Sequence, residues 1–90
     1  MKTHELKILP KYFELVKKEL KMFELRKNDR NYEVWDKVLL KEFENGEYTG
    51  RYGLFIITCV IKDCPEYGLM EGYCILGLGD MLGDYERGMR

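Results

Sequence analysis

The sequence predicts a small α+β domain: a mixed β-barrel of about five strands with one early amphipathic helix. Short stretches of alternating polar and apolar residues, separated by turn signals, recur along the chain and indicate strands. A single stretch near the start has the periodicity of a helix. Because a short open sheet leaves its edges exposed, we expect the strands to form a closed or nearly closed barrel.

The helix is expected at residues 11–20, after a short strand at 4–9. Phe13, Val16 and Leu20 recur on one side of this stretch at helical spacing, so they are expected to face the core. Pro10 suits the first helical position, because its fixed φ matches a helix and its missing N–H leaves no donor unpaired.

Four further strands complete the expected barrel, at residues 21–27, 37–44, 50–61 and 73–78. Asn45-Gly46 is the strongest turn signal, because both residues tolerate the positive φ of a tight hairpin. The apolar centre of 50–61 indicates a strand buried on both faces or bent around a corner. Residues 1–78 would form a single domain, and the glycine- and charge-rich residues 79–90 a flexible C-terminal tail.

The charge is nearly balanced overall but uneven along the chain. A net charge of −1 over 90 residues argues against a general nucleic-acid coat protein. Residues 7–30 contain eight cationic side chains and four carboxylates, a local excess of four positive charges. The sequence therefore predicts one basic face on a nearly neutral protein.

The cysteines and the apolar runs predict a cytoplasmic protein without a membrane partner. Cys59, Cys64 and Cys74 form no Cys-x-x-Cys pair, which favours reduced thiols over a disulfide framework. The polar, charged start of the chain does not resemble a signal peptide, and the apolar run 54–61 is too short to cross a bilayer. The three thiols and the single histidine have no zinc-site spacing, so we expect neither metal nor cofactor. Cys59 and Cys74 lie in apolar strands and are expected to be buried.

The most informative segment is Lys21-Met-Phe-Glu-Leu-Arg-Lys-Asn-Asp-Arg30. Its alternation places Phe23 and Leu25 on one face of a strand, with Glu24 and Arg26 on the other. Cations gathered beside one carboxylate suit the binding of a phosphate or a base edge. The alternative is a surface strand with a Glu–Arg salt bridge and solvated lysines.

In a ligand site built on this segment, each side chain is expected to make a different contact with the ligand. We expect Arg26 to take a phosphate or a guanine edge, and Glu24 to accept a hydrogen bond from an exocyclic amine. Tyr48 and Arg51 follow the Asn-Gly turn and are expected at a shared mouth of the site, where the Tyr48 ring would stack on an unpaired base. The alternative is a hairpin in which Tyr48 caps the core. The full set of expected ligand-binding residues is Lys21, Glu24, Arg26, Lys27, Arg30, Tyr48 and Arg51.

Other single residues carry less functional information. Trp35 is expected in the core or as a loop lid. His4 is the only histidine, and we expect a strand-end residue with its hydrogen bonds satisfied rather than a general base. The chain contains no serine, which excludes serine-hydrolase chemistry.

Six blocks, in order over residues 4–78, resemble a known family: His4-Glu-Leu-Lys-Ile8, Tyr12-Phe-x-x-Val16, Lys21-x-Phe-Glu-x-Arg-Lys-Asn-Asp-Arg30, Tyr48-Thr-Gly-Arg51, Gly68-Leu and Gly72-Tyr73. Together they resemble an ASCH-related, PUA-like family of small phage and bacterial proteins catalogued as a domain of unknown function, DUF3850. The resemblance implies a PUA-like barrel with a cleft between helix and barrel. It also implies a superfamily associated with RNA binding and RNA-modifying systems.

The chain departs from the family pattern at two places, and from a superfamily relative at a third. The family usually begins a turn with glycine where this chain has Glu19, and usually has Val-Gly-Asp where Trp35 takes the place of the glycine. A side chain with a Cβ tolerates such turn conformations less well than glycine. A superfamily relative, the acetylcytidine amidohydrolase, uses a Lys-x-x-Thr pair; Lys21 matches its lysine, but Glu24 replaces the threonine.

Three functions from different classes follow. The first is a non-enzymatic module that binds RNA or a modified nucleotide in a basic cleft between helix and barrel. The second is a nucleoside or RNA hydrolase, an amidohydrolase or ribonuclease, with Lys21 as base and Glu24 as its acid–base partner. The third is a phage-encoded protein-interaction or anti-defence protein, whose aromatic residues and C-terminal tail would contact a protein partner.

Overall fold

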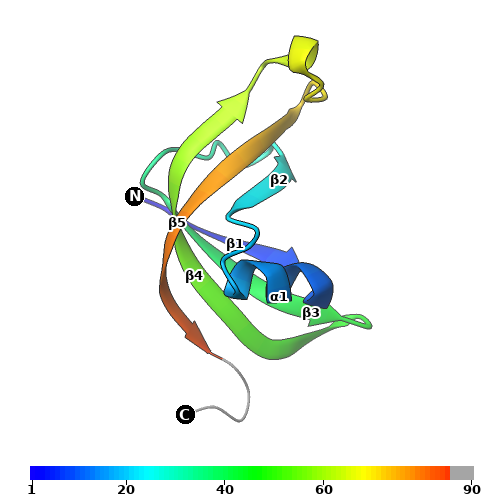
Figure 1. The fold of residues 1–90 in the computed structure, drawn as a ribbon, viewed down its shortest axis with the longest axis vertical. Helices are drawn as coiled ribbons and strands as arrows, with labels where there is room; N and C mark the ends of the chain where they lie inside the picture. Colours follow the sequence, from blue (N-terminus) through cyan, green and yellow to red (C-terminus); the bar gives the residue numbers. More distant parts are fainter. Residues whose placement is uncertain (86–90) are drawn as a thin grey trace.

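The computed structural model describes residues 1–85 as a mixed five-stranded sheet, curled into a half-barrel, with one α-helix packed against it (Figure 1). The elements are β1 (Thr3–Ile8), α1 (Pro10–Lys17), β2 (Phe23–Lys27), β3 (Lys37–Glu44), β4 (Glu47–Lys62), the 3-10 turn η1 (Pro65–Tyr67) and β5 (Tyr73–Tyr85). The strand order is β1-β3-β4-β5-β2, with β1 parallel to β3 and the other pairs antiparallel. The α+β class is therefore confirmed, but the sheet forms a half-barrel and not the expected closed or nearly closed barrel, because β1 and β2 are edge strands that do not pair with each other.

Helix α1 is shorter than the sequence indicates. Leu9 is extended before Pro10, as expected, and Phe13 and Val16 are buried against the sheet. The helix ends at Lys17 because the backbone turns into the left-handed region at Glu19, where φ is 62°. Leu20, expected on the core side of the helix, therefore lies beyond it and is exposed.

The hairpin between β3 and β4 forms at the Asn-Gly turn. Asn45 and Gly46 both have positive φ, 53° and 81°, as this kind of tight hairpin requires. In β4 the buried residues Gly53, Phe55 and Ile57 alternate with more exposed ones. The strand is therefore buried on one face, and shifts of register against β5 show that its course is irregular, as a bend requires.

The expected flexible tail from residue 79 is wrong for residues 79–85. Strand β5 continues to Tyr85 and pairs with the first half of β4. Glycines on both sides of residue 78 permit close strand pairing: a Cβ at Gly77, in the expected strand, would lie 2.6 Å from the Cys59 sulfur, and one at Gly79, in the expected tail, would lie 2.8 Å from Ile56 Cγ2. Residues 86–90 lie outside the described part of the chain.

A buried polar cluster ties the start of β1 to the turn before β3. His4 Nε2 and Asp36 Oδ2 are 2.9 Å apart, and the His4 ring packs against Tyr32. The Asp36 carboxylate also accepts hydrogen bonds from the backbone N–H groups of Lys2 and Glu33. The hydrogen bond from His4 is the main reason that the pKa of Asp36 is lowered. His4 is thus a buried residue near the start of β1 whose Nε2 is hydrogen-bonded to Asp36, in keeping with the structural role that the sequence indicated.

Two expectations about burial are wrong. Trp35 does not lie in the core, the first of the two places expected for it: its side chain is exposed on the turn before β3, where φ is 79°. Cys74 is buried and its pKa is raised by desolvation, but Cys59, expected to be buried too, is exposed on β4. Within residues 1–85, no helix is long and apolar enough to cross a membrane.

Candidate ligand-binding pocket

Strand β2 turns its charged face inward and its apolar face outward. Glu24 is only 4% exposed, whereas Phe23 is 47% and Leu25 58% exposed. An uncompensated carboxylate would be costly to bury, so this orientation requires cations beside Glu24. The sequence shows that β2 has two faces but not which of them lies inside.

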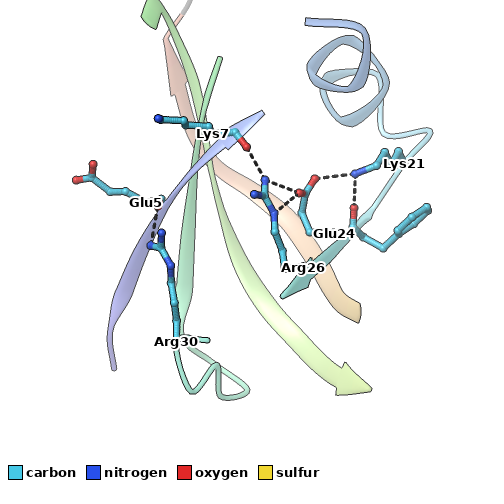
Figure 2. A network of polar contacts seen from close by, with 7 residues as sticks. Glu5, Lys7, Lys21, Glu24, Arg26 and Arg30 are labelled. Atoms are coloured by element: carbon cyan, nitrogen blue, oxygen red, sulfur yellow. Dashed lines mark hydrogen bonds and ion pairs between the residues drawn. The ribbon is translucent and has the colours of Figure 1, made fainter. Parts of the chain in front are cut away.

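The buried Glu24 carboxylate is held between two cations (Figure 2). Its Oε2 accepts a hydrogen bond from Lys21 Nζ at 2.6 Å, and its Oε1 accepts one from Arg26 Nε at 3.0 Å. Arg26 Nη2 is also 2.9 Å from Oε1. One negative charge therefore stands against two positive ones, and the Lys21–Glu24–Arg26 triad retains a net positive charge.

Two arginines bridge the opening of the half-barrel, which we call the β1–β2 seam. Arg26 Nη2 donates to the Lys7 carbonyl oxygen at 2.6 Å, and Arg30 Nη1 donates to the Glu5 carbonyl oxygen at 2.8 Å (Figure 2). Both acceptors belong to the backbone of β1. Side chains from β2 and the following turn thus contact the edge of β1 across the seam.

Beside the triad lies a pocket of about 650 Å³, which we call the α1–β2 pocket. Its lining comes from the end of β1, from α1, from the α1–β2 connection and from β2: Lys7, Ile8, Leu9, Tyr12, Leu15, Leu20, Lys21, Phe23, Glu24, Leu25 and Arg26. Mostly apolar walls with a few charged groups are typical of small-molecule sites of this size. The Lys21 ammonium lies 4.9 Å from the centre of the Phe23 ring and 5.7 Å from that of the Tyr12 ring.

The structure brings only part of the expected residue set to this pocket. Lys21, Glu24 and Arg26 line it, whereas Lys27 and Arg30 line a smaller neighbouring hollow that shares Arg26.

Arg51 and Tyr48 do not reach the α1–β2 pocket. The Arg51 guanidinium lies 2.7 Å from Glu14 on α1 and 3.2 Å from the buried Glu42 on β3. Its hydrogen bond lowers the pKa of Glu14. The Tyr48 ring packs edge-on against Phe43, with centroids 5.1 Å apart. Arg51 therefore joins helix to sheet, and Tyr48 packs within its hairpin, so the shared mouth expected from the sequence is not formed.

Two aromatic residues of the pocket, Tyr12 and Phe23, were not among the expected site residues. Both are partly exposed although they lie on amphipathic elements whose apolar side would ordinarily face the core. One sequence signal could have found them. Glu24 with Arg26 and Lys21 beside it forms ion pairs that allow the polar face of β2 to turn inward, and the apolar face with Phe23 is then exposed.

The arrangement favours binding over proton abstraction by Lys21. The Lys21 ammonium donates hydrogen bonds to Glu24 Oε2 and to the Phe23 carbonyl oxygen. In this arrangement Lys21 acts as a cation and hydrogen-bond donor, whereas a general base needs a free lone pair. Among residues 1–85, no cluster of three or more acidic, histidine or cysteine side chains is placed to hold a metal ion.

Comparison with known proteins identifies the family. Residues 3–78 match the family described as "Domain of unknown function (DUF3850)". The chain belongs to this family. It is also 50% identical over 83 residues to the "Uncharacterized 12.9 kDa protein in GpA 3'region" of Escherichia phage P2, a match that covers 90% of this chain and 73% of the phage protein. The DUF3850 match includes every residue that lines the pocket.

The structure also explains how this DUF3850 chain tolerates its departures from the family pattern. Glu19 and Trp35 replace the glycines that the resemblance implied, and both keep the positive φ, 62° and 79°, that glycine adopts easily. In this chain each of these two positions carries backbone strain, which is about 1–2 kcal/mol for a left-handed residue with a Cβ.

Proposed function

We propose that this DUF3850 protein is a PUA-like module that binds single-stranded RNA, or a modified nucleotide, by holding an unpaired base in the α1–β2 pocket. The observation that carries the proposal is the pairing of aromatic, solvent-accessible walls with a positively charged polar floor. The mixed half-barrel with one early helix against it supports the PUA-like assignment, together with the sequence resemblance.

The pocket offers both interactions that recognition of an unpaired base uses. Tyr12 and Phe23 provide partly exposed rings on which a base stacks. The triad provides the polar edge contacts: Lys21 and Arg26 donate to ring nitrogens or carbonyl oxygens, while Glu24 Oε2, which accepts only from Lys21, has a further lone pair for an exocyclic amine.

The charge distribution fits a small footprint on the RNA. A protein with a net charge of −1 is not suited to contact many phosphates along an RNA strand. Its local positive excess lies within residues 7–30, which supply the lining of the pocket. Affinity for RNA should therefore fall with salt, with a slope that corresponds to only a few phosphates.

The test is a fluorescence anisotropy titration with short labelled single-stranded RNAs. Tyr12→Ala and Phe23→Ala should each weaken binding by about 5- to 150-fold, which corresponds to about 1–3 kcal/mol for a lost stacking contact. Tyr67→Ala is the matched control, because Tyr67 is 86% exposed on η1 and does not line the pocket.

Two results would overturn this function. One is wild-type protein that binds none of the RNAs at low salt. The other is a Tyr12→Ala or Phe23→Ala variant that is folded, as judged by circular dichroism, and binds RNA as tightly as Tyr67→Ala does.

A protein-interaction role is the second candidate, and exposed apolar side chains favour it. Leu9, Leu20 and Leu25 surround the pocket and are each more than half exposed, and contiguous exposed apolar patches commonly mark interfaces. The phage P2 relative makes a host protein a reasonable partner to seek. A host protein captured without RNA, and lost from a Leu20→Asp/Leu25→Asp variant, would support this role.

A further inference from the structure

A second hollow of about 110 Å³ lies beside the α1–β2 pocket, next to the β1–β2 seam. We call it the turn hollow, and its lining residues are Leu6, Arg26, Lys27, Asp29, Arg30 and Tyr32. Three of these side chains are cationic and one is a carboxylate. The hollow is therefore positively charged, and it is too small for the drug-sized ligands that occupy sites of about 300–1,000 Å³.

The cations of the turn hollow retain donors for a ligand. Arg26 and Arg30 each use part of the guanidinium to reach a β1 carbonyl oxygen, which fixes the position of the rest. A guanidinium carries five N–H donors in a planar fork that matches phosphate geometry. Within residues 1–85, the exposed Lys27 ammonium makes neither an ion pair nor a hydrogen bond.

The remaining polar groups of the turn hollow are compatible with an anion. Tyr32 is buried, and desolvation raises the pKa of its phenol, so the hydroxyl stays protonated and able to donate. Asp29 is the one carboxylate; it is exposed, and its Oδ1 is 3.9 Å from Arg30 Nε. Its charge is therefore partly compensated and largely solvated.

We propose that the turn hollow binds one phosphate group of the nucleotide whose base occupies the α1–β2 pocket. Arg26 lines both spaces and joins them. The base and phosphate of one nucleotide are separated by a single ribose, so two adjacent subsites suit one nucleotide. This inference rests on the proposed function and narrows its ligand: a nucleoside phosphate or an RNA chain binds, and a free nucleoside binds more weakly.

The test measures the affinity of cytidine and adenosine against that of their 3′- and 5′-monophosphates, by NMR chemical-shift titration of the full chain. At least one monophosphate should bind about 10-fold tighter than its nucleoside. Lys27→Ala should remove roughly 3- to 5-fold of that gain, in keeping with an ion pair at a partly exposed site, and leave nucleoside affinity unchanged.

The matched control is Lys18→Ala, because Lys18 is an exposed lysine that lines neither space. If nucleosides bind but no monophosphate binds tighter, the phosphate subsite is wrong while the proposed function stands. The subsite is equally wrong if Lys18→Ala lowers monophosphate affinity as much as Lys27→Ala does. If neither nucleosides, monophosphates nor RNA bind, the proposed function and the subsite both fail.

Discussion

Replacing Glu24 with glutamine should destabilise the fold more than any exposed charge change. The substitution keeps the size of the side chain but removes the negative charge between Lys21 and Arg26. Two cations then lie side by side with no counter-charge between them, and one of the Glu24 oxygens becomes a donor that faces another donor.

The expected magnitude follows from burial. Removing one partner of a fully buried ion pair costs about 3–5 kcal/mol. Glu24 is buried, but the side chains of Lys21 and Arg26 are 15% and 24% exposed, so water can hydrate them in part. We therefore expect Glu24→Gln to lower the free energy of unfolding by about 2–3 kcal/mol, a large share of the stability of a small domain.

Urea denaturation followed by circular dichroism measures this difference. Glu5→Gln is the control, because Glu5 is 63% exposed and its contact with Lys41 is 3.4 Å; its loss should cost less than about 0.5 kcal/mol. A Glu24→Gln variant as stable as Glu5→Gln would show that the triad is solvated, and the account of an inward-facing charged strand would be refuted.

Three further predictions concern other parts of the fold. Glu19→Gly should raise the free energy of unfolding by about 0.5–1 kcal/mol in urea, because relief of left-handed strain exceeds the entropy cost of glycine; a loss of stability would contradict the strain. Because the hydrogen bond from His4 lowers the pKa of Asp36, that stabilisation is present above the ordinary carboxyl value of 3.8 and is lost as pH falls below it. Asp36→Asn should therefore show a shallower loss of stability between about pH 5 and pH 2, and an unchanged slope would count against the pair. A thiol reagent should modify Cys59 in the native protein and Cys74 only after unfolding, as mass spectrometry can show.

The sequence was sufficient to predict most of the sheet, because the determining signals are local. Alternation identified the strands, and Asn45-Gly46 fixed the β3–β4 hairpin. The end of β5 could not be predicted in this way. Whether residues 79–85 are strand or tail depends on the backbone of β4 with which they pair, and that strand comes from a distant part of the sequence.

The candidate site was predicted where it is local in sequence and missed where it depends on tertiary packing. Lys21, Glu24 and Arg26 converge because they stand within six residues on and beside one strand. Arg51 lies elsewhere because two carboxylates on other elements, Glu14 and Glu42, hold it against the helix. No property of the segment around Arg51 reveals those partners.

The most direct test of the central claim is an NMR titration of the isotope-labelled protein with a short unpaired RNA. If the α1–β2 pocket holds the base, the largest amide shifts will come from residues 7–12 and 20–26, and they will saturate with increasing RNA. Shifts confined to η1 and the β4–β5 hairpin, or no saturable shift at all, would contradict it.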